Sequence, residues 1–202
     1  MTPLSELNSN PDNTALSAED AEQLIPDLST RQDLDEYERQ NILLAQDWAF
    51  STRALKHNDP LDEIYIRELH RQMFKDTWKW AGKYRIRDVN RGCSSAEIIT
   101  RIANLLSDGR YWLSHKTFAL EEIAIRIHHR MVGEIHPFPN GNGRHARMLA
   151  DILLTKHGGE RFTWGRSNLV SSSTVKEAYL SALRQLDADS NNVAPLLNFA
   201  RS

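Results

Sequence analysis

The segment 136–147 constrains the fold of this chain more than any other; it reads His-Pro-Phe-Pro-Asn-Gly-Asn-Gly-Arg-His-Ala-Arg. Gly141 and Gly143 have no Cβ, so the backbone there can reach positive φ angles and bring its N–H groups close to an anion. The apolar run at 148–154 predicts a buried helix that follows directly. The glycine turn is therefore predicted at a helix N-terminus, where unpaired N–H groups and the helix dipole bind phosphate.

One histidine and two arginines flank this turn. Arg144 and Arg147 are three residues apart, which puts them on one face of the predicted helix, and guanidinium groups suit phosphate oxygens. His136 lies before the turn, where a neutral imidazole can take the proton of a hydroxyl that attacks phosphorus. The segment thus predicts a nucleotide site with a general base.

The same segment resembles the signature of the Fic (Fido) family, H-x-F-x-[D/E]-G-N-G-[K/R]-x-x-R, and departs from it at one specified position. The resemblance implies an all-α fold, a Fic-type helical bundle with a small β-hairpin flap beside the active site. It implies a protein adenylyltransferase that moves AMP from ATP to a Ser, Thr or Tyr hydroxyl of a target protein or of itself. His136 would be the catalytic base, and the residues that bind nucleotide phosphates would be Asn140, Gly141, Asn142, Gly143, Arg144 and Arg147.

The departure is Asn140, which stands where the family usually has a carboxylate that binds Mg²⁺. A neutral amide oxygen is a poorer ligand for a hard cation, so Asn140 is a weak metal ligand, second to the phosphate oxygens. The expected substrate is ATP and the expected metal is Mg²⁺ or Mn²⁺. Two alternatives stay open: a Fic-fold transferase of UMP, phosphocholine or phosphate, and a low-turnover nucleotide-binding regulator in a toxin–antitoxin-like pair.

Composition bounds the partners and the compartment. The chain has 202 residues, a net charge of −2 and a single cysteine, Cys93. This charge gives no general attraction to nucleic acid or to an anionic membrane, and one cysteine cannot form an intramolecular disulfide. No window approaches the length of a membrane span. We expect a bacterial cytoplasmic protein with no nucleic-acid partner and no membrane association.

A metallohydrolase is not favoured by the histidines upstream of the signature. His128 and His129 are adjacent on a predicted helix and point about 100° apart, so they do not readily share one ion with Glu134 and His136. The arginines near the signature favour one nucleotide over a nucleic-acid polymer, because the overall charge is acidic.

Helical spacing of apolar residues extends along most of the chain from about residue 30. It predicts helices through Ile42, Ala45 and Trp48; Leu61, Tyr65, Leu69 and Met73; Ile98, Ile102 and Leu105; Leu120, Ile123, Ile127 and Met131; Val175, Ala178, Ala182 and Leu186; and from Pro195. The rhythm is broken at 78–92, where short alternation and an Asn-Arg-Gly turn predict a small hairpin. By the resemblance this hairpin is the flap that holds the target protein by strand addition, through Tyr84, Ile86 and Val89.

The sequence divides into an N-terminal tail with a possible inhibitory helix, 1–29, and a catalytic domain, 30–202. Many Fic proteins carry a Ser/Thr-x-x-x-Glu-Gly/Asn helix whose Glu pairs with the second signature arginine. Residues 18–23 match it in part, so the resemblance implies that Glu22 restrains Arg147; the alternatives are a solvated acidic helix here and control by an antitoxin-like partner. The pattern Leu24-Ile25-Pro26, Thr30-Arg31 and Glu38-x-x-Asn41-Ile42 resembles the subgroup called mobile mystery protein B.

Overall fold

The computed structural model describes residue 19, residues 22–165 and residues 172–202. These ranges form the helices α2 (Arg31–Ala49), α3 (Thr52–His57), α4 (Glu63–Phe74), α5 (Ile98–His115), α6 (Leu120–His129), α7 (Asn142–Lys156), α8 (Ser172–Ala188) and α9 (Ala194–Arg201). A 3-10 turn, η2 (Ser95–Glu97), precedes α5, and a π-helical turn, η3 (Arg130–Ile135), extends α6. The predicted all-α fold class is confirmed.

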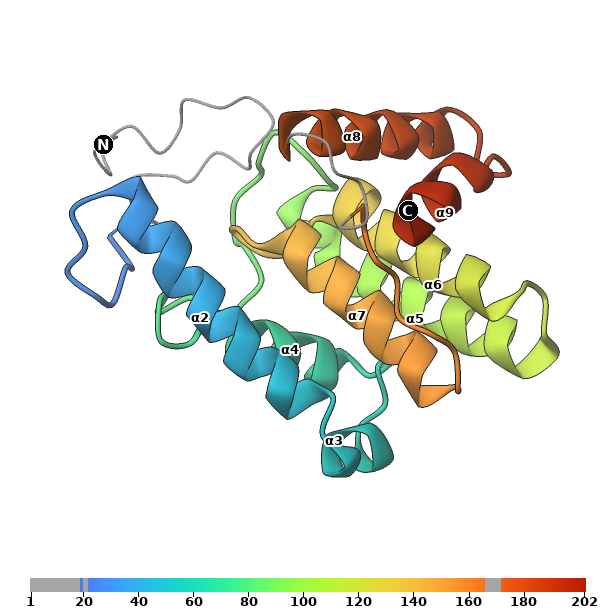
Figure 1. Ribbon diagram of the computed structural model, residues 1–202, viewed down its shortest axis with the longest axis horizontal. Coiled ribbons are helices and arrows are strands. Elements are labelled where there is room, and N and C mark those ends of the chain that lie inside the picture. Colours follow the sequence, from blue (N-terminus) through green and yellow to red (C-terminus); the bar gives the residue numbers. More distant parts are fainter. Residues whose placement is uncertain (1–18, 20–21, 166–171) are drawn as a thin grey trace.

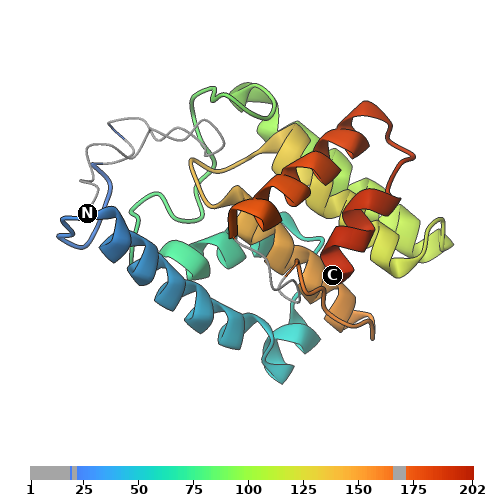
Figure 2. The same ribbon diagram turned by 45° about the horizontal axis from the view of Figure 1, so that its top comes forward.

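Helix α7 lies at the centre of the molecule, with α2 and α6 on opposite sides of it (Figure 1, Figure 2). It packs against α6, α4 and α3, while α2 packs on α4 and α8 on α9. Nine of its 15 residues are buried. Because a helix surrounded by others must be apolar on most sides, the run at 148–154 is explained by this central place. In the described ranges, no helix has both the length and the apolar character needed to cross a bilayer.

The helix starts show how α7 differs from its neighbours. Thr30, Ser51 and Asp62 cap α2, α3 and α4, because each side-chain oxygen accepts a hydrogen bond from an N–H two or three residues further on. The N-cap of α7 is Gly141, at φ 76°, and no side chain of the described residues caps this end. A helix that begins in this way leaves the N–H groups of its first turn for another acceptor.

Residues 83–94 form a loop, and none of the described residues there is in a strand. The predicted hairpin flap is therefore not formed. The predicted alternation is reversed at its centre, because Arg85 is buried and Ile86 is 86% exposed. The Arg85 N–H donates to the carbonyl of Pro137 at 2.9 Å instead of to a neighbouring strand. The loop is thus attached to the segment that follows η3, and not to itself.

The N-terminal part of the described chain runs beside the start of this loop. Leu24 and Trp78 form an isolated antiparallel bridge, the Lys79 N–H donates to the Gln23 carbonyl at 2.9 Å, and the Ile25 N–H donates to the Thr77 carbonyl at 2.8 Å. The helix predicted before Pro26 and the tail before it lie largely outside the described residues. At the described end of that segment, residues 22–23 form a turn.

Candidate active site

A cavity of about 950 Å³ lies between α2, the start of α7 and α8. Its lining includes every residue that the sequence analysis assigned to base or phosphate: His136, Asn140, Gly141, Asn142, Gly143, Arg144 and Arg147. Arg31 and Glu38 of α2 and Lys176 and Tyr179 of α8 also line it. The structure therefore brings the predicted site residues together at one end of the central helix.

His136 is held in an uncommon backbone conformation at the edge of this cavity. Its φ of 50° and ψ of 61° lie in the left-handed region, and it follows the π turn η3, whose end is closed by a bond from the His136 N–H to the Met131 carbonyl at 3.0 Å. π turns and left-handed residues other than glycine both occur preferentially at functional sites. The sequence offered no sign of this turn, because η3 continues the apolar spacing of α6.

The environment of the His136 ring fixes its tautomer and its charge. Nδ1 lies 2.9 Å from the Val132 carbonyl, which can only accept, so Nδ1 carries the proton and the lone pair of the neutral ring is on Nε2. Burial, together with the nearby charges of Arg85 and Arg91, lowers the pKa of His136 to about 4, against the opposing effect of the Val132 carbonyl. The ring is therefore neutral at pH 7, as a general base must be.

The turn before α7 is closed by its own side chains. Asn142 Oδ1 accepts from the Phe138 N–H at 2.9 Å, and Asn142 Nδ2 donates to the Phe138 carbonyl at 2.8 Å. Asn140 Oδ1 accepts from the Gly141 N–H at 2.5 Å. Phe138 is fully buried and anchors the loop to the core. The Asn142 side chain thus stabilises the turn.

His70 of α4, which the sequence did not indicate, supports this turn through its ring nitrogens. His70 Nε2 donates to the Asn140 carbonyl at 3.1 Å, while Nδ1 accepts from the Gly82 N–H at 3.0 Å. Its ring stacks on Phe138, with 3.7 Å between ring centres. Burial holds the pKa of His70 well below its usual value, which keeps the ring neutral and Nδ1 able to accept. Its only signal in the sequence is its place near the apolar face of α4.

Arg144 is held on the α2 side of the cavity. Its Nη1 donates to Glu38 Oε2 at 2.5 Å, and its guanidinium lies 5.0 Å from the centre of the Phe74 ring. Glu38 Oε1 accepts from Trp78 Nε1 at 2.7 Å, and Glu38 is 5% exposed. The carboxylate that reaches a signature arginine is thus Glu38. The sequence pattern at 18–23 instead predicts Glu22 for a comparable contact with Arg147.

Glu22 is exposed, it does not line the cavity, and it forms no ion pair with Arg147 within the described ranges. The inhibitory contact expected from the sequence is therefore not formed here. The predicted docking residues lie on the loop and not in the cavity: Tyr84 is half-buried near Phe138, Ile86 is exposed and Val89 is half-buried.

Arg147 is held on the opposite, α8 side. Its guanidinium lies 5.5 Å from the centre of the Tyr179 ring, and the Tyr179 hydroxyl lies 2.9 Å from His128 Nε2. His129 instead contacts Asp187 through Nε2, at 2.7 Å. The adjacent histidines thus have separate partners on α8. Arg144 and Arg147 share the cavity, as predicted, but each is supported by a different wall.

The side chains around Asn140 do not fit a protein-held Mg²⁺. The single amide oxygen at this position accepts from the Gly141 N–H. Across the part of the chain that the structure describes, no three His, Cys, Asp or Glu side chains gather closely enough to hold a metal ion. A hard cation would therefore depend on oxygen atoms of the nucleotide and of water.

Comparisons with known proteins agree with this geometry. The model of the Fic/DOC family matches residues 60–154. The chain is 33% identical over 144 residues to the probable protein adenylyltransferase y4lH of Sinorhizobium fredii, covering 67% of this chain and 69% of that protein. Its fold is similar to a Fic domain containing signaling protein of Bacteroides thetaiotaomicron, with a TM-score of 0.63, 22% identity, and coverage of 86% of this chain and 70% of that one. It is also similar to the ADP-bound N-terminal Fic domain of a Bartonella quintana cell filamentation protein, with a TM-score of 0.63, 17% identity, and coverage of 88% and 87%.

Proposed function

The chain belongs to the Fic/DOC family, and from this premise we propose that it is a protein adenylyltransferase. It moves AMP from ATP to a Ser, Thr or Tyr hydroxyl of a target protein or of itself. The observation that carries the proposal is the neutral His136, whose Nδ1 is committed to Val132, beside a helix start with no side-chain cap and two arginines. The Sinorhizobium fredii relative y4lH is a probable protein adenylyltransferase, which supports the same activity.

In this proposal each part of the cavity has one task. The N–H groups in the first turn of α7 bind the α- and β-phosphates, since they have no acceptor within the helix. Arg144 and Arg147 bind the β- and γ-phosphates from the α2 and α8 sides. His136 Nε2 accepts the proton of the target hydroxyl, the hydroxyl oxygen forms a bond to the α-phosphorus, and the bond to pyrophosphate breaks. Positioning of the reactants and stabilisation of the charge in the transition state supply most of the rate enhancement.

The metal enters this scheme with the substrate. Because Asn140 offers one neutral oxygen that is already hydrogen-bonded, Mg²⁺ would depend on phosphate oxygens and water for its ligands. No step of the proton transfer passes through the metal. The loop at 83–94 would receive the target protein, with Ile86 as its most exposed apolar side chain.

Two residues of the pattern that resembles the mobile mystery protein B subgroup have a structural role in the fold. Glu38 and Asn41 are both buried on α2, and both bind the segment 76–78: Glu38 through the Trp78 indole, and Asn41 Oδ1 through the Asp76 N–H at 3.3 Å. We propose, on the sequence pattern alone, that the chain belongs to the mobile mystery protein B subgroup. We further propose that an antitoxin-like partner controls the activity, the alternative to control by Glu22 that the sequence left open.

The test is transfer of radioactive label from ATP to protein, with α-label and γ-label in parallel and with Mg²⁺ or Mn²⁺. Adenylylation predicts protein labelled from the α-position, including self-modification. Label from the γ-position instead would indicate phosphate transfer. ATP binding without label from either position would indicate a regulator.

The variant His136→Ala should abolish transfer, a loss of at least about 100-fold for a missing base, and leave ATP affinity within a few-fold. His115→Ala, which removes an exposed histidine at the end of α5, is the matched control. Transfer by His136→Ala at the unaltered rate would refute the assignment of the base.

A further inference from the structure

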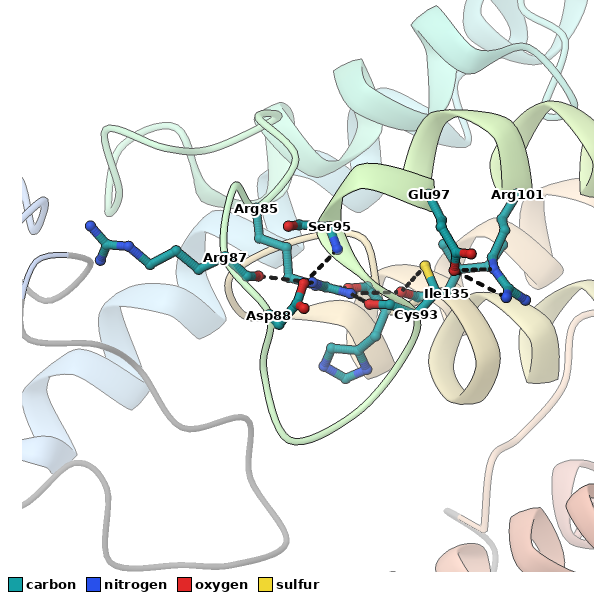
Figure 3. A network of polar contacts seen from close by, with 9 residues as sticks. Arg85, Arg87, Asp88, Cys93, Ser95, Glu97, Arg101 and Ile135 are labelled. Carbon is teal, nitrogen blue, oxygen red and sulfur yellow. Dashed lines mark hydrogen bonds and ion pairs between the residues drawn. The ribbon is translucent and has the colours of Figure 1, made fainter.

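Arg85 is a buried arginine whose guanidinium binds backbone carbonyls in two different segments (Figure 3). Nε donates to the His136 carbonyl at 2.8 Å, and Nη2 donates to the Ile135 carbonyl at 3.2 Å. Its own N–H donates to the Pro137 carbonyl at 2.9 Å. One residue therefore binds three consecutive carbonyls, which are those of the base and of its two neighbours in the chain.

The same guanidinium also binds both ends of the loop that follows Arg85. Nη1 donates to the Arg87 carbonyl at 2.8 Å, and Nη2 donates to the Cys93 carbonyl. Asp88 lies 3.7 Å from Nη1 and accepts from the Ser95 N–H at 2.6 Å (Figure 3). The two ends of the loop are thus joined through the same side chain that binds the backbone of His136.

The loop also approaches His136 directly. A Cβ on Gly92 would lie 2.5 Å from the His136 Cβ and 2.5 Å from the Ile135 carbonyl oxygen. This space is closed to any other residue, because real Cβ atoms do not come so close. The loop and the base therefore fit together at two independent points, Arg85 and Gly92.

We propose that Arg85 is a positioning residue that sets the orientation of the His136 imidazole and couples it to the conformation of the loop 86–94. The proposal rests on the proposed function, in which His136 is the base. A left-handed backbone at φ 50° is unfavourable for histidine and needs bonds from outside to persist. Arg85 supplies those bonds, so a target protein that engages the loop acts on the same contacts that hold the base.

The chemistry of the contacts requires a guanidinium. Arg85 presents donors from Nε, Nη1 and Nη2 in a rigid plane, and four carbonyls lie around that plane. The ammonium of lysine is a compact group with donors at one point, and it cannot reach both segments. Substitution of Arg85 by lysine keeps the positive charge and removes the planar set of donors. It therefore distinguishes the effect of the hydrogen-bond geometry from the effect of the charge.

The experiment compares Arg85→Lys and Arg85→Ala with the matched control Arg101→Ala. The Arg101 side chain of α5 is 46% exposed and pairs with Glu97, outside the loop and the cavity, so the control leaves the network intact. Three quantities are measured for each: ATP affinity by calorimetry, kcat with KM for label transfer, and the titration of the His136 ring by NMR. The third needs no enzymatic activity.

For both Arg85 variants we expect ATP affinity within about threefold, and a fall in kcat approaching about 100-fold, the loss that a misplacement of about 1 Å can cause. The His136 titration should move from acidic pH toward the value of an exposed histidine. Millimolar methylguanidinium should restore part of the rate of Arg85→Ala and none of that of His136→Ala. Arg101→Ala should match the unaltered protein in all three quantities.

Two results would overturn the proposal: a His136 titration and kcat unchanged in Arg85→Lys, or ATP affinity falling in proportion to kcat. If the Arg85 variants do not fold, Gly92→Ala disturbs the same junction from the loop side and must give the same pattern. Absence of transfer in the unaltered protein would refute the proposed function alone, because the NMR titration would still decide whether Arg85 positions the ring.

Discussion

Replacement of Gly141 by alanine tests the geometry at the start of α7, with a matched control at Gly158, just beyond the end of the same helix. Gly141 has a φ of 76°, and an added Cβ would lie 2.5 Å from Phe74 Cζ. Phe74 cannot easily move aside, because it is fully buried and its ring centre lies 4.8 Å from that of His70. The substitution therefore combines backbone strain with overpacking.

The expected loss of stability follows from these two effects. A left-handed conformation costs alanine about 1 kcal/mol, and an extra methyl group in a packed core costs about 2 kcal/mol. Their sum is about 3 kcal/mol, which for a chain of this size lowers Tm by about 9 °C. Gly158 follows α7 with a φ of 80° and no atom within 4 Å of its added Cβ, so Gly158→Ala carries the strain alone. It should lower Tm by about 3 °C.

The assay is thermal unfolding of both variants, with ATP affinity measured by calorimetry. Gly141→Ala should also weaken ATP binding, because it displaces the first turn of α7 and the Phe74 ring that lies under Arg144. A second variant, Phe74→Leu, makes room for the added methyl group. The double variant should therefore lose less stability than the sum of the losses of the two single variants. Equal losses for Gly141→Ala and Gly158→Ala would refute the argument from Phe74.

Three further predictions concern charge. Burial lowers the pKa values of His128, His136 and His145 to about 3, 4 and 4. Because the unfolded chain takes up these protons near pH 6.5 and the folded chain does not, the protein has its full stability above about pH 6.5 and loses stability as the pH falls toward about 4. Tm measured from pH 7.5 to 5 should fall, and a constant Tm would contradict the neutral burial. Asn140→Asp restores a charged oxygen, so transfer should reach half of its maximum at a lower Mg²⁺ concentration, and an unchanged Mg²⁺ titration would show that the position does not meet the metal. Arg147→Ala should weaken ATP more than AMP, because the contact is to the distal phosphates; equal weakening in calorimetry would place Arg147 elsewhere.

The parts of the site that the sequence predicted are those encoded by neighbours in the chain. The glycine turn, the helix after it and the histidine before it lie within twelve residues, and the structure places them as expected. The role of Arg85 was not predicted, because alternation of apolar residues around a charged one reads as a strand with the charge outward. In the fold that charge is inward, since its acceptors come from residues 135–136, about fifty positions later.

Glu38 shows the same limit of prediction from the sequence, here for a buried carboxylate. It meets Arg144 across 106 positions, and on the sequence it is one of several acidic residues of a polar helix. Its burial depends on the docking of α2 against α4, which no local pattern encodes. The choice of Glu22 as the carboxylate for a signature arginine came from a short motif, and short motifs do not report which helix reaches the cavity.

The contacts that complete the base have a consequence for the order of folding. By the proposal above, the left-handed backbone and the buried ring of His136 are stabilised when the loop at 85–93 closes on residues 135–137, a junction between segments far apart in the chain. Helices form locally and early, whereas such distant junctions bear the entropy of loop closure and come late. During refolding, helicity should therefore recover before the acidic titration of His136 does. A newly made chain would carry an exposed, ordinary histidine until the last part of its folding, so chemistry at the cavity begins only in finished molecules.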